Sequence, residues 1–243
     1  IRVKRGKYMS TLLLRLAAPM QSWGADSKFN WRRTERAPTK SGVVGLIAAA
    51  LGRRRNESIE DLQALRFGVR ADKEGKLLRD YHIAKNPEDP KKTYVTYRYY
   101  LSDAVFLVGL EGNLELLRQI EYALNNPVFP LYLGRRSCPP YGRLCLGIRV
   151  DKPLEQALKE ERLQTSALTK HGHSETSLRI ILDADNSHPS FYLLRDMPIS
   201  FDQSHRRFGF RRVYETTLPA VAGDSNPAAS VPTEHDAMSE LEG

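Results

Sequence analysis

The sequence predicts an α+β fold, a ferredoxin-like sandwich of the kind also found in RNA-recognition motifs. Three observations support this. A nearly apolar strand at Thr11–Ala18 is followed by a short, well-bounded helix at 39–52, a long hairpin follows that helix, and a second helix at Leu114–Leu124 precedes a further apolar strand. The order strand, helix, strand, strand, helix, strand is the βαββαβ order of that sandwich.

The first strand is predicted at Thr11–Ala18 because the run is almost wholly apolar over a strand's length and Pro19 ends it. Such a run is typical of a strand at the centre of a sheet. Residues Met20–Gly24 are predicted to form the turn that follows.

The first helix has clear boundaries. Pro38 and Thr39 signal its start, with Thr39 or Ser41 able to cap it, and Gly52 signals its end. We expect this helix to be buried against a sheet. One face of the helix is apolar and carries Val43, Ile47 and Leu51. A neighbouring strip has almost no side chain, which lets another backbone approach, and it consists of Gly42, Gly45, Ala49 and Gly52.

The start of this helix is a candidate phosphate site. Arg33, Arg36 and Lys40 surround its first N–H groups, at the positive end of the helix dipole. A buried helix with a solvated basic entry explains the same residues equally well. Residues 38–42 resemble the end of a nucleotide-binding phosphate loop, but the glycine before the Lys-Ser pair is missing, which argues against a nucleotide triphosphatase.

A long hairpin is predicted next, with strands at Lys76–Ile83 and Tyr94–Val108 and a proline-rich loop at 86–92. Alternation along the second strand gives it two aromatic faces: Tyr97 and Tyr99 on one, Tyr94, Arg98 and Tyr100 on the other. The two faces of an isolated hairpin cannot both be buried in a core, so we expect one of them to contact a partner.

The remaining elements follow in order. Residues 62–69 are predicted to be a short apolar scaffold segment. Asn113 begins the second helix and Asn125–Pro127 ends it. Leu131 starts a strand that leads into a Gly-Arg-Arg-Ser bend, and Leu144–Val150 forms another.

The chain becomes more polar beyond residue 150. We predict a main domain at 9–150, a small β-rich region at 151–218 and a disordered acidic tail at 219–243. Residues 1–8 are expected to be an extension outside the fold. The second region is expected to hold a helix at 154–163, strands at 178–182 and 191–194, and a last basic strand at His205–Tyr214 that borders an anionic partner.

Charge points to a nucleic acid as that partner. The chain has 37 Lys and Arg against 29 Asp and Glu, a net charge of +8. Five of the acids lie after residue 218 and no Lys or Arg does, so residues 1–218 carry 37 minus 24, or +13. A body that basic is expected to bind a polyanion. A membrane surface is the weaker alternative, and no apolar run approaches the ~20 residues of a membrane-spanning helix, so we expect a cytoplasmic protein with no membrane partner.

No cofactor or metal is expected. Cys138 and Cys145 have neither zinc nor disulfide spacing and are predicted to be packed thiols. His171, His173 and Glu175 are close in sequence, but a solvated loop explains them better than a metal site does.

Metal-free RNA cleavage is the one enzymatic alternative. It needs a base and a cation beside the 2′-hydroxyl, and Tyr81, His82 and Lys85 at the hairpin are the candidates. A structural role for His82, hydrogen-bonded at the end of a strand, is favoured over a catalytic role.

Several blocks together resemble the CasD subunits of type I-E CRISPR Cascade complexes, within the RAMP superfamily. The resemblance runs in order from about Leu12 to Tyr214 and thins beyond Val150. The blocks are Leu12–Gly24, Pro38–Leu46, Leu78–His82, Tyr100–Ala104 and Tyr132–Pro139.

This resemblance implies a noncatalytic subunit that holds the 5′ handle of the crRNA and caps the backbone filament in antiviral defence. Its partners would be the Cascade backbone subunit, the large subunit and, indirectly, target DNA. The hairpin at 78–102 would be the thumb that such subunits insert in their ferredoxin-like body. The RNA-binding candidates are Gln21, Trp23, Arg33, Arg36, Lys40, Ser41, Tyr81, His82, Arg98, Arg135, Arg136 and Ser137.

Two alternatives stay open. One is that the chain is a metal-independent endoribonuclease. In type I-E systems a separate endoribonuclease, CasE, cuts the precursor, whereas relatives of the CasD subunits in systems that lack CasE cleave repeat RNA themselves. The other is a free-standing, nonspecific RNA-binding protein, which would show a steep salt dependence and no preference for the handle.

Overall fold

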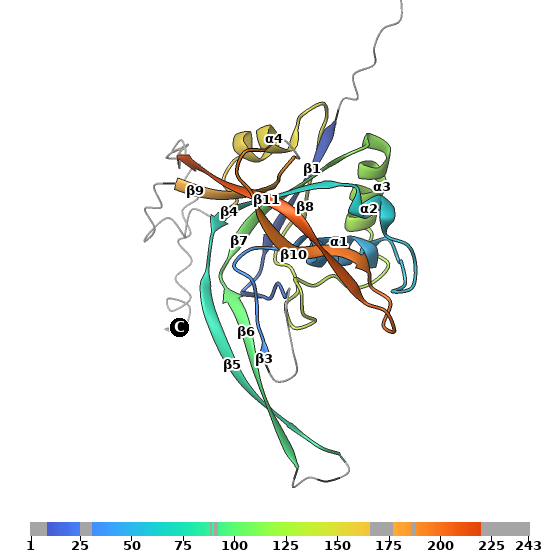
Figure 1. The fold of residues 1–243 in the computed structure, drawn as a ribbon, viewed down its shortest axis with the longest axis vertical. Coiled ribbons are helices and arrows are strands. Elements are labelled where there is room, and N and C mark those ends of the chain that lie inside the picture. Colours follow the sequence, from blue (N-terminus) through green and yellow to red (C-terminus); the bar gives the residue numbers. More distant parts are fainter. Residues whose placement is uncertain are drawn as a thin grey trace, which may run out of the picture.

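The computed structural model describes residues 9–24, 31–87, 89, 92–165, 177–185 and 188–219, and the statements below concern these residues. The chain has a mixed α+β fold with two sheets (Figure 1). Its elements are β1 (Ser10–Ala17), β2 (Met20–Gln21), β3 (Trp31–Arg32), α1 (Lys40–Ala50), α2 (Glu60–Gln63), β4 (Arg66–Lys73), β5 (Lys76–Lys85), β6 (Thr93–Ser102), β7 (Val105–Gly112), α3 (Leu114–Asn125), β8 (Cys145–Arg149), α4 (Leu154–Glu160), β9 (Ser177–Asp183), β10 (Tyr192–Ser200) and β11 (Arg207–Pro219).

The larger sheet has seven strands in the order β10-β11-β9-β4-β7-β1-β8, and every pairing in it is antiparallel. β1 lies between β7 and β8 and is covered on both faces. Its Leu12, Leu14 and Leu16 join the core under α1 and α3, while Leu13 faces the smaller core under α4. The prediction of an interior strand at Thr11–Ala18 is confirmed.

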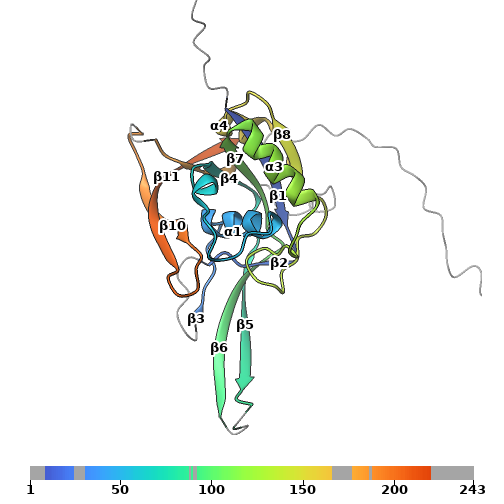
Figure 2. The same cartoon turned by 90° about the vertical axis from the view of Figure 1, so that its right-hand side faces the viewer.

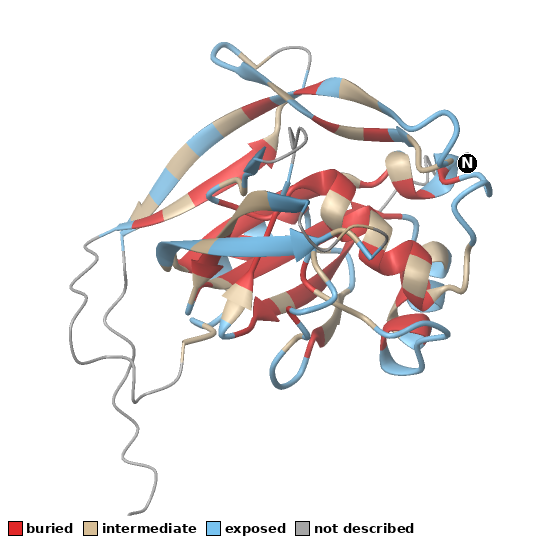
Figure 3. Ribbon diagram, turned by 90° about the horizontal axis from the view of Figure 1, so that it is seen from below, coloured by how far each residue is buried: buried red, intermediate tan, exposed pale blue. Residues whose placement is uncertain are grey.

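Helix α1 is buried as predicted, and the caps explain its boundaries. The Thr39 side chain accepts a hydrogen bond from the Gly42 N–H at 3.2 Å. At its other end another backbone does come close, because the Val128 and Phe129 N–H groups donate to the Ala50 and Ala49 carbonyls. Figure 3 shows how the buried residues gather in the helices and strands of this body.

The second strand of the large sheet was predicted in the wrong place. It is β4, at Arg66–Lys73, rather than Lys76–Ile83, which forms the first arm of the hairpin. The sequence pattern did not indicate this strand, because the charged residues Arg70 and Asp72 interrupt its apolar run. In the structure both are buried and pair with each other, with Arg70 Nε to Asp72 Oδ1 at 2.6 Å.

Two smaller corrections concern the loops. Leu131 does not start a strand: the residues that lead into the 134–137 bend are irregular. Met20 and Gln21, predicted as a turn, instead pair with Ser102 and Leu101 of β6.

The hairpin of β5 and β6 forms a second sheet with β2 and β3 and projects from the body (Figure 2). Its register pairs Tyr81 with Tyr97 and His82 with Thr96. The two-faced strand is confirmed: on one face Trp31 of β3 stacks on Tyr97 with ring centroids 4.6 Å apart, while Tyr100 is buried on the other.

The C-terminal strands extend the same large sheet, because β9 pairs with β4. The predicted helices at 114–124 and 154–163 are present as α3 and α4, and Asn113 caps α3 through Glu115 N at 2.7 Å. The division of the chain at residue 150 stays a prediction. Residues 1–8, the 171–175 cluster and residues 220–243 lie outside the described part of the chain.

Candidate nucleic-acid interface

Three arginines meet at the base of the hairpin. Arg32 on β3 lies opposite Arg98 on β6 in the parallel pairing of these strands. Arg135, from the 134–137 bend, donates from Nη2 to the Arg32 carbonyl at 2.9 Å and lies over the Tyr100 ring at 4.5 Å. The fold thus gathers three positive charges from separate parts of the sequence.

The bend that carries Arg135 depends on a glycine. Gly134 has a φ of +88°, and a Cβ there would lie 1.6 Å from the Ser22 carbonyl oxygen. Only glycine tolerates this conformation and this approach. This glycine therefore fixes the backbone of the bend from which Arg135 and Arg136 project.

Two guanidinium nitrogens in this cluster are buried without a hydrogen-bond partner among the described residues: Arg98 Nε and Arg135 Nη1. A buried donor left unpaired is expensive, and native proteins leave few of them. A phosphate matches the planar, forked geometry of a guanidinium. The arginine cluster therefore has the chemistry of a site that an anion completes.

A groove of about 860 Å³ lies beside this cluster. Its floor is the small-residue strip of α1, including Gly45 and Ala49, and its walls are residues 129–139 and the β10–β11 tip at Phe201 and Arg206. Five arginines line it: Arg53, Arg54, Arg55, Arg136 and Arg206.

The described residues neutralise the charges of the groove only in part. Arg53 pairs with Asp61 at 2.5 Å. Arg206 differs, because burial and then repulsion by Arg55 lower the pKa of its guanidinium. Arg136 lines the groove while Arg135 lies at the hairpin base, so the 134–137 bend joins the two basic surfaces.

The predicted site residues divide by exposure. Arg98 and Arg135 are half-buried in the cluster. Six further candidates are exposed: Arg33, Arg36, Tyr81, His82, Arg136 and Ser137. Among these, the structure brings Arg98, Arg135 and Arg136 closest to a common surface, whereas Tyr81 and His82 lie farther out on the hairpin.

Lys40 does not face solvent, and the start of α1 is already occupied. The Lys40 N–H donates to Asp196 Oδ2 at 2.9 Å, and its Nζ donates to the Leu65 carbonyl at 2.6 Å and to Asp183 at 3.3 Å. Burial lowers the pKa of Lys40, and Asp183 opposes that shift. The predicted phosphate site at this helix start is therefore corrected: an internal carboxylate takes that position, and Ser41 beside it is also buried.

Gln21 and Trp23 form part of the core. The Gln21 amide donates to the carbonyls of Leu16 and Ala104 at 3.1 and 2.8 Å, and its oxygen accepts from Trp23 Nε1 at 3.1 Å. All the polar atoms of these two side chains are satisfied internally. We therefore leave Gln21, Trp23, Lys40 and Ser41 out of the RNA surface proposed below.

Comparisons with known proteins identify the family of the chain. A family model described as CRISPR-associated protein (Cas_Cas5) matches residues 11–214. The chain belongs to this family. It is similar to the CRISPR system Cascade subunit CasD of Escherichia coli strain K12, with 38% identity over 159 residues, which cover 57% of this chain and 70% of that protein.

Two solved structures of Cas proteins resemble the chain. One is described as a crystal structure of a Cas protein, at 44% identity and a TM-score of 0.68, covering 86% of this chain and 95% of that one. The other is a chain of a CRISPR RNA-guided surveillance complex, at 35% identity and a TM-score of 0.69, covering 86% and 91%.

Sequence reasoning missed several arginines of this Cas_Cas5 chain. The arginine run at residues 53–55 is visible in the sequence, but no local pattern there indicates a groove. Arg32 is not among the RNA-binding candidates that the sequence predicts. Arg206 lies in the basic stretch predicted to border an anionic partner, and it does line the groove with the others.

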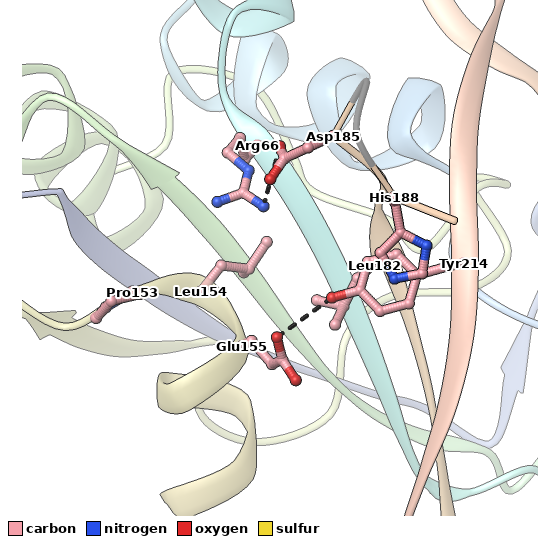
Figure 4. Close-up of a pocket in the computed structure, with 8 residues that line it drawn as sticks. All are labelled: Arg66, Pro153, Leu154, Glu155, Leu182, Asp185, His188 and Tyr214. Carbon is pink, nitrogen blue, oxygen red and sulfur yellow. Dashed lines mark hydrogen bonds and ion pairs between the residues drawn. The ribbon is translucent and has the colours of Figure 1, made fainter. Parts of the chain in front are cut away.

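A second pocket of this family member, of about 420 Å³, has a different character (Figure 4). His188 stacks on Tyr214 at 3.9 Å, and the Tyr214 hydroxyl donates to Glu155 at 3.3 Å. Burial and then Glu155 raise the pKa of Tyr214 to about 12. Arg66 lines this pocket together with two carboxylates, Glu155 and Asp185, and pairs with Asp185 at 3.6 Å, so the pocket lacks the excess of positive charge that a polyanion needs.

Other sites are absent from the described part of the chain. Its residues contain no group of three His, Cys, Asp or Glu side chains placed to hold a metal ion. None of its helices is both long and apolar enough to cross a membrane. Cys138 and Cys145 are free, buried thiols, as predicted, and burial raises the pKa of each.

Proposed function

We propose that this chain is a crRNA-binding subunit of a type I-E Cascade complex, which holds the 5′ handle and caps the backbone filament. Family membership and the similarity to a Cascade subunit and to a surveillance-complex chain support the general role. The observation that carries the binding site is the pair of buried guanidinium nitrogens, on Arg98 and Arg135, that lack a partner.

The handle RNA would follow the basic surface from the hairpin base to the groove. Arg98 and Arg135 would hold one phosphate, and Arg136 at the far side of the bend would hold a later one. Single-stranded RNA is bound by such a combination of arginines and aromatic rings, and Tyr132 and Phe129 line the groove where bases would stack. Arg33, Arg36 and Ser137 are exposed candidates for further contacts.

The hairpin would act as a thumb against the neighbouring backbone subunit. Its Trp31 face is aromatic yet open to solvent, with Trp31 48% and Tyr81 56% exposed. Exposed aromatic residues of this kind are enriched in protein interfaces. The Cascade large subunit and, through the complex, target DNA are further partners in this proposal.

The subunit would be noncatalytic. Tyr81 and His82 are consecutive residues of β5, so their side chains project to opposite faces of the hairpin and do not converge on one phosphate. Both are exposed, whereas a general base is usually held by partners. Nothing in this arrangement favours the endoribonuclease alternative.

We infer a ferredoxin-like body for this chain from its central strands. The sub-order β4-β7-β1-β8, with α1 and α3 packed on one face, supports that assignment. A body at 9–150 with a small β-rich region at 151–218 remains our proposal for the domains, with the cytoplasm as the location.

The test is handle binding by an Arg98→Ala, Arg135→Ala double variant. Charge-assisted hydrogen bonds contribute about 1.5–3 kcal/mol each, so affinity for a handle oligonucleotide should fall at least about tenfold. An Arg118→Ala, Arg162→Ala variant, which removes two exposed arginines elsewhere, is the matched control and should bind normally. Equal affinity of both variants would refute the site.

The endoribonuclease alternative is tested with the full chain, a repeat RNA hairpin and EDTA. We expect tight binding and intact RNA. Cleavage that disappears in Tyr81→Ala or His82→Ala would instead establish the enzyme.

A further inference from the structure

The sequence that follows β11 has an uneven charge distribution. Residues 220–233 are mostly Ala, Ser, Pro and Val and hold one acid, Asp224. Residues 234–242 then hold four acids and no Lys or Arg, with His235 as the one residue that can become cationic, and with two large apolar residues between the acids: Glu234, Asp236, Glu240 and Glu242, with Met238 and Leu241. A neutral spacer thus leads to a short acidic and apolar peptide.

We propose that residues 234–242 bind the arginine-lined groove of their own chain and compete there with RNA. This inference rests on the proposed function, because the groove is assigned to RNA in it. The occupant is a segment of this chain, identified by its charge, its apolar residues and its reach.

Charge complementarity is the first argument. The groove has five arginines, and among the ion pairs of the described residues only Arg53 has a carboxylate partner, Asp61. Arg55 and Arg206 are near enough to repel each other, so an anion between them would relieve that repulsion. Carboxylates pair with guanidinium groups in the same forked geometry that phosphates use.

The apolar lining of the groove is the second argument. Leu46, Phe129, Leu131 and Phe201 line it, and Gly45 and Ala49 leave room over α1. A Cβ at Gly45 would meet only the Phe201 ring, at 3.6 Å. Met238 and Leu241 lie three apart in the sequence and can bury apolar surface there while the flanking acids meet arginines.

The spacer has the length that this contact needs. Arg206 lines the groove and directly precedes β11, while the spacer begins after Pro219 at the other end of that strand. Thirteen residues of strand span about 43 Å. The fifteen residues from Pro219 to Glu234 can extend to about 50 Å, so the acids reach the groove in cis.

Competition of this kind would favour the cognate RNA. A tethered peptide has a high effective concentration at the groove, which excludes polyanions that bind by charge alone. An RNA that also fills the arginine cluster at the hairpin base would displace it. We therefore expect the segment to weaken nonspecific RNA binding more than handle binding.

Photo-crosslinking of the full chain without RNA tests the contact directly. A photoreactive amino acid is placed at Met238, and the crosslinked peptides are identified by mass spectrometry. We expect crosslinks within one molecule to groove residues 129–136 or 201–206 at low salt, and their loss at 0.5 M salt, where ion pairs are screened. Crosslinks spread over the surface, or mainly between molecules, would overturn the proposal.

Charge neutralisation tests the competition. In the variant E234Q/D236N/E240Q/E242Q we expect a mixed-sequence RNA to bind about fivefold more tightly at low salt, since exposed ion pairs are individually weak. The matched control is D224N, in the spacer, which should bind as the unmodified chain does. Unchanged affinity in the fourfold variant would contradict the competition.

These readouts separate this inference from the function on which it rests. If the crosslinks fall in the groove but Arg98→Ala, Arg135→Ala leaves handle binding unchanged, the proposed RNA site fails and the peptide contact stands. If handle binding falls in that variant but the crosslinks do not reach the groove, the peptide contact alone is overturned.

Discussion

Asp196 of β10 is fully buried, and donors from two other elements meet on it. Its carboxylate accepts the Lys40 N–H at the start of α1 and two N–H groups of Arg211 from β11, at 2.6 and 2.9 Å. Arg211 also reaches Asp183 of β9 at 2.5 Å, and Asp183 accepts from Lys40 Nζ at 3.3 Å. At the scale of the residue, this network of alternating charges ties α1 to the edge of the large sheet.

We predict that Asp196→Ala destabilises the chain by about 3–5 kcal/mol, because it leaves the buried Arg211 charge without the carboxylate that pairs with two of its nitrogens. Urea unfolding of the full chain measures this. Asp185→Ala, which removes an exposed partner of Arg66, is the control and should change the free energy of unfolding by at most about 1 kcal/mol. A loss below about 1 kcal/mol for Asp196→Ala would mean that the network is not a stabilising contact.

At the scale of the element, what the sequence could predict depended on how local the signal was. Helix α1 was predicted within two residues at each end because Thr39 and Gly52 mark its boundaries themselves. The hairpin was predictable for the same reason, since its turn and its alternation are local. β4 was not, because the partners that make Arg70 tolerable in the core include Leu158 and Glu161, far along the chain.

The same limit applied to the site. Arg135 could be picked from its bend, but its unpaired nitrogen exists only because Tyr100 and the Arg32 carbonyl lie against it. Lys40 looked like a phosphate ligand because nothing near it in sequence revealed Asp183 and Asp196. Sequence patterns give the residue types of a site, and long-range pairing decides which of them stay available.

The outer half of the hairpin is held mainly by its own pairing. β3 contacts β6 at Tyr97 and Arg98, and β2 contacts it at Leu101 and Ser102, so no described strand outside the hairpin pairs with residues 83–95. We predict that replacing 83–95 with Asn-Gly, which favours a tight turn between the paired His82 and Thr96, leaves the free energy of unfolding within about 0.5 kcal/mol. Urea unfolding measures this.

The same deletion should abolish co-purification with a Cascade backbone subunit, if the hairpin is the thumb proposed above. A point variant at the tip, Lys85→Ala, serves as the control and should still assemble. Assembly that survives the deletion would exclude residues 83–95 from that interface and leave it to the base of the hairpin, where Trp31 and Tyr81 lie, or to the body of the molecule.

At the scale of the whole molecule, the basic groups are not spread evenly. The groove and the arginine cluster meet at the 134–137 bend, whereas the pocket under α4 carries Glu155 and Asp185 against one arginine. Six arginines of the basic surface have no carboxylate partner among the ion pairs of the described residues: Arg54, Arg55, Arg98, Arg135, Arg136 and Arg206. Affinity for RNA should therefore depend on salt through this surface.

The size of that dependence can be predicted. Each phosphate neutralised on single-stranded RNA contributes about −0.7 to the slope of log affinity against log salt, so six arginines give a slope of about −4. Arg136→Ala with Arg206→Ala should reduce its magnitude by about 1.4, while Arg118→Ala with Arg162→Ala should leave it unchanged. Fluorescence anisotropy of a labelled handle RNA between 50 and 300 mM salt measures all three. A slope near −1 in the unmodified chain would show that RNA engages only one or two of these arginines, and would restrict the interface to the cluster at the hairpin base.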